Sequence, residues 1–310
     1  CAPSYDLNGL KDAFTWGPWT SLRQCPLKFT GHQFRLRDND IIVHQQEFTL
    51  STPTKRLRVG PATDRLLQLA EEYSEYRSCG GSLQWLSGHS RPDCSAATSL
   101  SQRGDPKLSD LASMYETIEH ARATSADGFC ISPLDLRKQC TVAYGDSSFA
   151  NAPGCKTQQG HITTLTETTC ATREARASIV DWRSGRAHRV VRSTLAGEAA
   201  ACDNAADSGV YTARFMAEVI HGRTRARQDL MLVPLYICTD CKSLYDAVKQ
   251  VTPSLSEKRT TIDIMSIKES VSAGGGRVMW LPTLHMKADG LTKMCKRLRT
   301  SLLAWQMNPI

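Results

Sequence analysis

The chain has 310 residues, a length that suffices for two domains, each with a hydrophobic core of its own. Hydrophobic residues make up 41% of it and charged residues 22%, and no apolar run approaches the roughly 18 residues that span a bilayer. The composition therefore predicts a globular protein and excludes a membrane-spanning helix. The net charge of +7 is compatible with an acidic polymer as partner but does not by itself indicate one.

The start of the chain and its cysteines bear on where the protein works. The chain begins with Cys1 rather than Met, which suggests a fragment or a processed product, and it lacks the apolar segment of a secretory signal. The 12 cysteines are scattered and no Asn-x-Ser/Thr acceptor occurs, so we expect reduced thiols in a cytosolic or nuclear protein. Cys238 and Cys241 form a CxxC pair without a second pair at zinc-finger spacing, which favours ordinary thiols over a zinc site.

The chain up to about residue 138 predicts a hairpin followed by helices. Residues 27–50 alternate apolar and polar side chains around the turn cluster Asp38-Asn39-Asp40. Apolar residues at helical spacing follow, with breaks predicted at Gly80-Gly81 and Arg91-Pro92. The predicted helical ranges are 62–76, 80–101 and 107–124.

The rest of the chain has the order of predicted strands and helices that is typical of a layered α/β fold. Strands are predicted at 140–146, 157–167, 174–184, 230–240 and 277–281. Helices are predicted at 193–222, 241–250, 256–274 and in the basic stretch at the C-terminus. The glycines at 274–276 lack the lysine of a phosphate-binding loop, so they predict a helix cap and a turn. Three strands, a helix, a strand, helices, a strand and a helix predict a mixed sheet with flanking helices.

Acidic residues at the ends of these elements are the strongest chemical signal. Asp146 ends the first of these strands and Asp240 ends the fourth, so both carboxylates emerge at one sheet edge if the two strands are neighbours. Glu198 lies in the first turns of an otherwise apolar helix, and Asp289 lies between Ala288 and Gly290. Each acid also has a simpler interpretation, as a first-turn residue that favours the helix dipole or as part of a solvated loop.

Together the four acids predict a metal site. Carboxylates about 4 Å apart repel one another by several kcal/mol, so such a cluster needs raised pKa values or bound cations. Oxygen ligands without cysteine or histidine favour Mg²⁺, and Mn²⁺ as a substitute. Two such ions can stabilise both the attacking and the leaving oxygen of a phosphodiester. The pattern therefore predicts two-metal phosphodiester hydrolysis.

Residues from about 141 to 295 resemble the ribonuclease H domain of Ty1/copia-type retrotransposon polyproteins. The matching segments, in order, are YGDSSFAN, RVVRSTLAGEAAA, TDCKSLYDAV, SEKRTTIDI and HMKADGLTK. The resemblance implies a ribonuclease H-like mixed five-stranded sheet with flanking helices. It also implies an Asp–Glu–Asp–Asp set of metal-binding catalytic residues at Asp146, Glu198, Asp240 and Asp289, assisted by His285. The loop that holds His285 is shorter than in retroviral relatives.

Two segments of the first part are FTGHQFRLRDNDIIVHQQEF at 29–48 and GGSLQWLSGHSRPDCSAATSLS at 80–101. They resemble the thumb and connection segments at the end of the reverse transcriptase in the same polyproteins. No Asp-Asp dipeptide occurs, so the Tyr-x-Asp-Asp turn of a polymerase is absent and we do not expect DNA synthesis. The resemblance implies a reverse transcriptase-like segment at 1–138 and a ribonuclease H-like domain at 139–310. It further implies the rest of the polyprotein as partner, and a place in a cytoplasmic virus-like particle, in the nucleus, or in both.

Basic clusters on both sides of the acids predict contacts with phosphates, which position a duplex without reading its sequence. The first cluster is Arg183, Arg186, His188, Arg189 and Arg192, and the second is Lys293, Lys296, Arg297 and Arg299. Solvated surface charge is the alternative for each. Ser147, Ser148 and Asn151 could donate hydrogen bonds to the 2′-hydroxyls of an RNA strand. Trp182 and Trp280 are expected in the core rather than as stacking platforms.

Three functions compete on this sequence. The first is a Mg²⁺-dependent endonuclease that cuts the RNA strand of RNA–DNA hybrids. The second is a non-catalytic nucleic-acid-binding remnant of a polyprotein. The third is an integrase or transposase, whose last acid would be Glu269, but this leaves Glu198 without a role.

Overall fold

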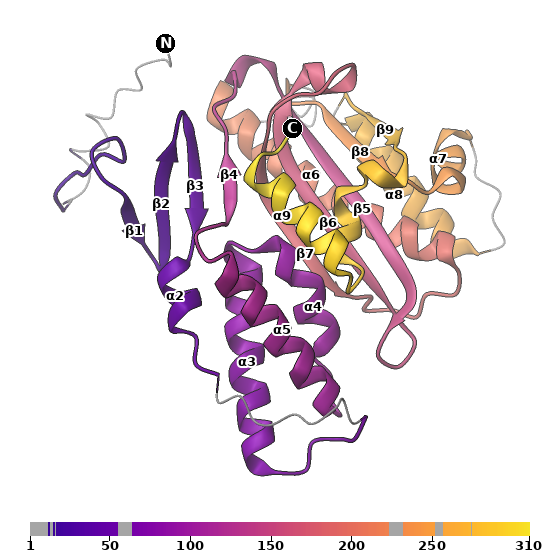
Figure 1. Ribbon diagram of the computed structural model, residues 1–310. Helices are drawn as coiled ribbons and strands as arrows, with labels where there is room; N and C mark the ends of the chain where they lie inside the picture. Colours follow the sequence, from indigo (N-terminus) through magenta and orange to yellow (C-terminus); the bar gives the residue numbers. More distant parts are fainter. Residues whose placement is uncertain are drawn as a thin grey trace.

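The structure, a computed structural model, describes residues 12, 15, 17–54, 64–222, 232–251, 257–273 and 275–310. They form two sheets and the helices that pack around them (Figure 1). Parts of the predicted elements, at 62–63, 230–231, 256 and 274, lie outside the described residues, as does most of the stretch before residue 17. Within the described residues, no helix is long and apolar enough to cross a membrane.

The first part of the chain forms a four-stranded antiparallel sheet in the order β1-β2-β3-β4. Its strands are β1 (Leu27–Phe29), β2 (His32–Arg37), β3 (Asp40–His44) and β4 (Phe129–Ile131). The predicted hairpin corresponds to β2 and β3, and Asp38 in its turn has φ of 57°, a conformation that short polar side chains tolerate. The sequence did not predict β4, because three residues are too few for an alternating pattern to appear.

The helices of the first part lie below this sheet in Figure 1. They differ from the prediction at one break and at one start, because residues 64–69 of the predicted helix 62–76 are not helical and Leu66 instead pairs with Lys107. They are α2 (Gln46–Ser51), α3 (Ala70–His89), α4 (Ser95–Ser101) and α5 (Leu108–Ala123). The predicted break at Gly80-Gly81 is wrong, because α3 runs through both glycines. A Cβ at Gly80 would lie 3.6 Å from Cε of Met114 in α5, so packing between the two helices outweighs the weak helix preference of glycine. The break at Arg91-Pro92 is confirmed, since Pro92 begins the 3₁₀ turn η1 (Pro92–Cys94).

The second part forms a five-stranded mixed sheet in the order β7-β6-β5-β8-β9. Its strands are β5 (Gln139–Ala152), β6 (Lys156–Glu167), β7 (Ala177–Arg186), β8 (Leu235–Thr239) and β9 (Arg277–Trp280). The first three strands are antiparallel neighbours, whereas β8 runs parallel to both β5 and β9. This order confirms the predicted fold class, an α/β ribonuclease H-like mixed sheet preceded by a smaller hairpin-plus-helices segment.

Helices cover both faces of the second sheet. They are α6 (Thr194–His221), α7 (Lys242–Lys249), α8 (Lys258–Ala273) and α9 (Lys296–Met307). Ala143 of β5 belongs to the core shared with α6, α7 and α8, whereas its neighbour Tyr144 packs in the core that contains Trp305 of α9. Since successive side chains of a strand point to opposite faces, α6 and α8 lie on one face and α9 on the other.

The position of Asp146 differs from the prediction that it ends its strand. The strand continues to Ala152, because β6 keeps pairing with β5 past Asp146, which lies opposite Gly160. The parallel ladder with β8 stops earlier, at Tyr144 opposite Cys238. Asp146 therefore lies just past the end of the parallel pairing, which still directs it to the carboxyl edge of β5 and β8.

A close approach of α6 to β5 fixes the strand residue before Asp146. A Cβ on Gly145 would lie 2.8 Å from Cα of Cys202 and 3.0 Å from the carbonyl oxygen of Ala201. We expect Gly145→Ala to lower the free energy of unfolding by about 2 kcal/mol, because backbone atoms of α6 must move. Gly81→Ala in α3 is the matched control, since its Cβ meets open space, and it should stabilise by about 0.5 kcal/mol. Urea unfolding measures both; equal effects would contradict the close approach.

The two parts of the chain are in contact. Trp182 of β7 donates from Nε1 to the carbonyl oxygen of Ser87 in α3 at 2.6 Å, and Arg176 forms an ion pair with Asp40 at 2.9 Å. The 3₁₀ turn η2 (Leu136–Lys138) ends where β5 begins at Gln139. The division into domains 1–138 and 139–310 stays a prediction.

Candidate active site

Three predicted acids meet at the carboxyl edge of β5 and β8. Asp146 comes from β5, Asp240 follows β8 directly, and Glu198 comes from the second turn of α6. One carboxylate oxygen of each lies within 4.8 Å of the others. Parallel pairing of β5 with β8 brings the two aspartates together, and packing of α6 on β5 adds the glutamate.

Glu198 is held by groups on both elements. Ser193 caps α6 by accepting a hydrogen bond from the amide of Ala196 at 3.1 Å, which fixes the register of the helix. Oε1 of Glu198 accepts a hydrogen bond from Ser147 Oγ at 3.0 Å. Oε2 of Glu198 is buried and has no hydrogen-bond partner. An unpaired buried carboxylate oxygen costs free energy, and a divalent cation is the group that this donor set fits.

Two threonines orient the aspartates. Asp146 is 2% exposed, and its Oδ2 accepts a hydrogen bond from Oγ1 of Thr292. Asp240 is half-buried, and its Oδ2 accepts from Oγ1 of Thr283 at 2.7 Å. The sequence did not single out these threonines; the only signal was that both lie close in the chain to His285 and Asp289.

The buried carboxyl groups resist ionisation when no cation is present. Burial raises the pKa of Asp146 to about 7, and the charges on Asp289 and Asp240 add to this, although Thr292 and Lys293 act in the opposite direction. Burial and then the charge on Asp146 raise the pKa of Glu198 to about 8. Near neutral pH Glu198 is therefore mostly protonated and Asp146 partly so, and a bound cation would displace these protons.

This gives a pH dependence with a defined sign. A carboxyl group whose pKa is higher in the folded than in the unfolded protein adds stability below its unfolded pKa. That contribution is lost as the pH rises through the folded pKa, here about 7 for Asp146 and about 8 for Glu198. In EDTA we therefore expect the free energy of unfolding to fall by about 3 kcal/mol or more between pH 5.5 and pH 9, and millimolar Mg²⁺ to suppress the fall.

Urea unfolding at several pH values measures this change. Asp146→Asn is the control for other titrating groups, because it removes one of the two carboxyl groups with little change in shape. The variant should lose markedly less stability over the same range in EDTA. A wild-type stability that stays flat or rises with pH relative to Asp146→Asn would contradict the prediction.

The fourth predicted acid lies beside the other three rather than among them. Asp289 is buried in the 3₁₀ turn η6 (Lys287–Leu291), and its Oδ1 forms an ion pair with Lys293 four residues later. Its oxygens are not part of the group within 4.8 Å. The structure therefore brings together three of the four acids, because Lys293 holds the fourth carboxylate. The predicted role of Asp289 as a metal ligand stays a prediction.

The predicted histidine lies at the rim of the site. His285 is exposed in the 3₁₀ turn η5 (Thr283–His285), two residues after the threonine that bonds Asp240. Trp280, which we expected in the core, is 43% exposed, so that expectation is wrong. Its Nε1 donates to the carbonyl oxygen of Asp240 at 3.0 Å, which supports the backbone of the acid.

The predicted RNA contacts have different surroundings. Ser147 is buried and donates to Glu198, a position that favours holding the carboxylate over reaching a substrate. Ser148 and Asn151 line a groove with Lys293. The same groove is lined by Leu100 and Arg103 from the first part of the chain, which the sequence did not single out.

The arginines predicted to contact phosphates differ in their exposure and in their protein partners. Arg186 lines a second groove with Lys156 and Trp182, against Ser99 and Gln102 of the first part. Arg189 forms an ion pair with Asp263 of α8, so its charge is already partnered. Arg192 is exposed. Trp182 is half-buried against Phe129, as expected for a core position.

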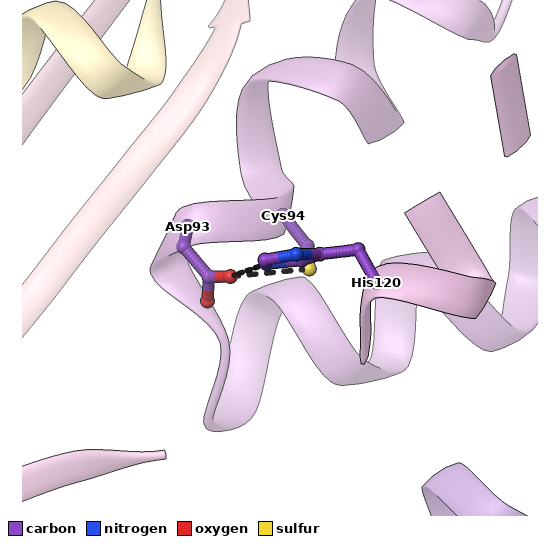
Figure 2. A group of neighbouring side chains, drawn as sticks. All are labelled: Asp93, Cys94 and His120. Carbon is purple, nitrogen blue, oxygen red and sulfur yellow. Dashed lines mark hydrogen bonds and ion pairs between the residues drawn. The ribbon is translucent and has the colours of Figure 1, made fainter. Parts of the chain in front are cut away.

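A second group of potential metal ligands lies in the first part of the chain. Asp93, Cys94 and His120 have ligand atoms within 4.8 Å of one another, and Figure 2 shows an oxygen of Asp93 facing both of the other side chains. Asp93 is already bound, however, by the buried guanidinium of Arg91, through two contacts of 2.8 Å. Burial raises the pKa of the Cys94 thiol, which keeps it protonated. The arrangement fits a buried ion pair and not a cation site.

No protein-family model and no curated protein matches this chain. Among solved structures, it is similar to ribonuclease H1 from Halobacterium salinarum NRC-1, with 13% identity over 49% of this chain and 92% of that chain and a TM-score of 0.31. The N-terminal RNase H domain of rv2228c from Mycobacterium tuberculosis has 11% identity over 52% of this chain and 96% of that chain, with a TM-score of 0.32.

A viral protein is similar over a comparable stretch. The foamy viral protease-reverse transcriptase in complex with an RNA/DNA hybrid has 11% identity over 55% of this chain but 21% of its own, with a TM-score of 0.34. Likenesses at this level carry no argument about activity. The fold rests on the strand order, and the site rests on its own side chains.

Proposed function

We propose that this chain is a metal-dependent endonuclease that hydrolyses the RNA strand of RNA–DNA hybrids, as part of a retrotransposon reverse transcriptase of the Ty1/copia type. The observation that carries the proposal is the convergence of the carboxylates of Asp146, Glu198 and Asp240, of which Glu198 has one buried oxygen without a hydrogen-bond partner. The resemblance of the sequence supplies the substrate class. The segment 1–138 belongs to the reverse transcriptase without its polymerase centre, and 139–310 is the ribonuclease H-like domain.

Asp146, Glu198 and Asp240 would hold Mg²⁺ ions, with Asp289 as the fourth ligand and Mn²⁺ as a substitute. When bound, two ions supply Lewis-acid stabilisation of the attacking and leaving oxygens of the phosphodiester. Ser147, Thr283 and Thr292 orient the carboxylates by hydrogen bonds. His285 at the rim assists product release.

The remaining residues hold the duplex without reading its sequence. Lys293, Arg186 and Arg192 contact phosphates, and Ser148 and Asn151 bond 2′-hydroxyls. Arg189 and Ser147 are less suited to such contacts, because each already has a protein partner. Lys293 would have to exchange its ion pair with Asp289 for a phosphate. The protein works in a cytoplasmic virus-like particle, in the nucleus, or in both, together with the rest of the polyprotein.

One observation favours the alternative, a non-catalytic nucleic-acid-binding remnant. The ion pair between Asp289 and Lys293 neutralises the fourth acid, as expected if no cation ever binds there. The two proposals differ in what a purified protein does to a labelled RNA–DNA hybrid.

The test compares this hybrid with an RNA duplex and a DNA duplex, in Mg²⁺, in Mn²⁺ and in EDTA. We expect cleavage of the RNA strand of the hybrid alone, dependent on the metal, with 5′-phosphate and 3′-hydroxyl ends. Binding of the hybrid without cleavage in either metal would favour the remnant. Cleavage or joining of DNA that depends on Glu269 would favour the integrase instead.

A further inference from the structure

Two cysteines that the proposed function does not use lie near the start of β5, before the part of the strand that carries Asp146. Cys140 is the second residue of β5, six residues before Asp146, and it is fully buried. Cys170 lies in the 3₁₀ turn η3 (Thr168–Ala171) after β6 and is partly exposed. Their Sγ atoms are 3.5 Å apart, although the residues are 30 positions apart in the chain.

We propose that Cys140 and Cys170 form an oxidative modification site, at which a peroxide converts the two neighbouring thiols into a disulfide bond.

The geometry requires only a small movement. A disulfide bond is about 2.05 Å long, so the sulfur atoms must approach by about 1.5 Å. Cys140 is held in place by the pairing of β5 with β6, where it lies opposite Thr166. The turn η3 contains no buried residue, so moving it toward Cys140 displaces no buried side chain of its own.

The two thiols differ in pKa and in exposure, and the reaction needs one accessible thiolate and one thiol that attacks afterwards. The hydrogen bond from Cys140, together with the charge of Arg277, lowers the pKa of Cys170, the sulfur that solvent reaches. The hydrogen bond to Cys170 and burial raise the pKa of Cys140, which keeps its proton. Cys170 is therefore the first sulfur to react, and Cys140 is the resolving thiol.

The reaction consumes one peroxide and releases two waters. The thiolate of Cys170 attacks one oxygen of hydrogen peroxide, the O–O bond breaks, and the departing hydroxide takes up the proton that Cys170 had lost. The sulfur of Cys140 then attacks the resulting sulfenic acid. The S–S bond forms, the S–OH bond breaks, and the hydroxide leaves with the proton of Cys140 as water.

A third cysteine defines the competing product. Cys238 of β8 belongs to the same apolar cluster as Cys140, with Cys170 packed against it. It is buried, and its pKa is raised by burial, so we expect it to remain a thiol. Cys295 is exposed and lies before α9, and it serves as the matched control cysteine.

The experiment uses the full chain, reduced and then treated with hydrogen peroxide, with free thiols alkylated before digestion without reductant. We expect a linked pair of peptides that contain Cys140 and Cys170, and an intact mass lower by about 2 Da, both reversed by dithiothreitol. The midpoint of thermal unfolding should rise by about 5 °C, because the bond closes a long loop. Cys295→Ser should behave like the wild type, whereas Cys170→Ser should lose the linked pair.

A second variant separates the chemical roles from any effect on folding. In Cys140→Ala, Cys170 should stop at the sulfenic acid, which dimedone traps as an adduct, and Cys170→Ser should give no adduct at this position. A link between Cys170 and Cys238, oxidation of Cys170 without a link in the wild type, or the same mass loss in Cys170→Ser would overturn the proposal. Because the readout is a covalent bond far from the acids, failure of the nuclease proposal would leave this result unchanged.

Discussion

Glu198→Gln is expected to abolish hydrolysis of the hybrid and, at the same time, to stabilise the metal-free protein. The amide keeps the shape of the side chain but replaces a charged ligand by a neutral group, so a cation loses one of three carboxylates. We expect kcat/KM for hybrid cleavage to fall by about 10³-fold, which corresponds to about 4 kcal/mol in the barrier. Cleavage of a labelled hybrid in Mg²⁺ measures the loss.

The gain in stability follows from the same side chain. Oε2 of Glu198 is buried without a hydrogen-bond partner, and burial raises the pKa of the group. A neutral amide removes the cost of burying this charge beside Asp146. At pH 9 in EDTA we expect the free energy of unfolding of Glu198→Gln to exceed that of the wild type by about 2 kcal/mol.

Glu269→Gln is the matched control, the same change on the exposed face of α8. It should leave hybrid cleavage close to the wild type. Cleavage retained in Glu198→Gln would place the active site elsewhere. A variant that is inactive but less stable than the wild type at pH 9 would contradict the account of the unpaired oxygen.

Asp93→Asn is expected to have the largest effect on stability. Both carboxylate oxygens of Asp93 bind the guanidinium of Arg91, whose side chain is 1% exposed. His120 Nε2 lies 2.9 Å from the same carboxylate, and Gln306 of α9 donates to it at 3.1 Å. Burial opposes ionisation, but Arg91 and His120 outweigh it and hold the pKa of Asp93 well below its usual range.

The neutral amide leaves the guanidinium buried without a counter-charge. Losing one partner of a buried ion pair costs about 3–5 kcal/mol, so the free energy of unfolding should fall by this amount. Urea unfolding at neutral pH measures it, and faster hydrogen exchange in α9 should accompany it, because Gln306 of α9 donates to the carboxylate that is lost. The control is Asp105→Asn, the same change at an exposed position between α4 and α5. It should change the free energy of unfolding by less than about 0.5 kcal/mol. An Asp93→Asn variant as stable as this control would show that the ion pair adds nothing.

The strands of the second sheet were within reach of sequence reasoning because local patterns indicate them, whereas their arrangement in one mixed sheet was implied by the resemblance to the ribonuclease H domain. Alternation identified β6 and β7, and short apolar runs identified β5 and β8. The length of β5 was not predictable, because its pairing past Asp146 depends on β6 and not on its own residues. Likewise, the helix α3 crosses Gly80 because Met114, distant in the chain, packs against it.

The residues of the candidate site also fall into those that local patterns predicted and those that they did not. Position near element ends indicated Asp146, Glu198 and Asp240. Parallel pairing of β5 with β8 brings the two aspartates to one edge, and packing of α6 on β5 adds the glutamate. The ion pair of Asp289 was not predicted, although Lys293 lies one helical turn away, because the sequence does not show whether a lysine faces a phosphate or an acid. The ion pair of Arg91 with Asp93 involves Gln306, more than 200 residues away, and no local pattern carries that information.

The unpaired oxygen of Glu198 has a consequence for the whole molecule. It is a point of local frustration, at which a side chain opposes the fold that the rest of the chain favours. Any divalent cation that binds there only in the folded protein links the folding equilibrium to the free cation concentration. Near its melting temperature, the fraction of folded molecules would then report the ionic composition of its surroundings.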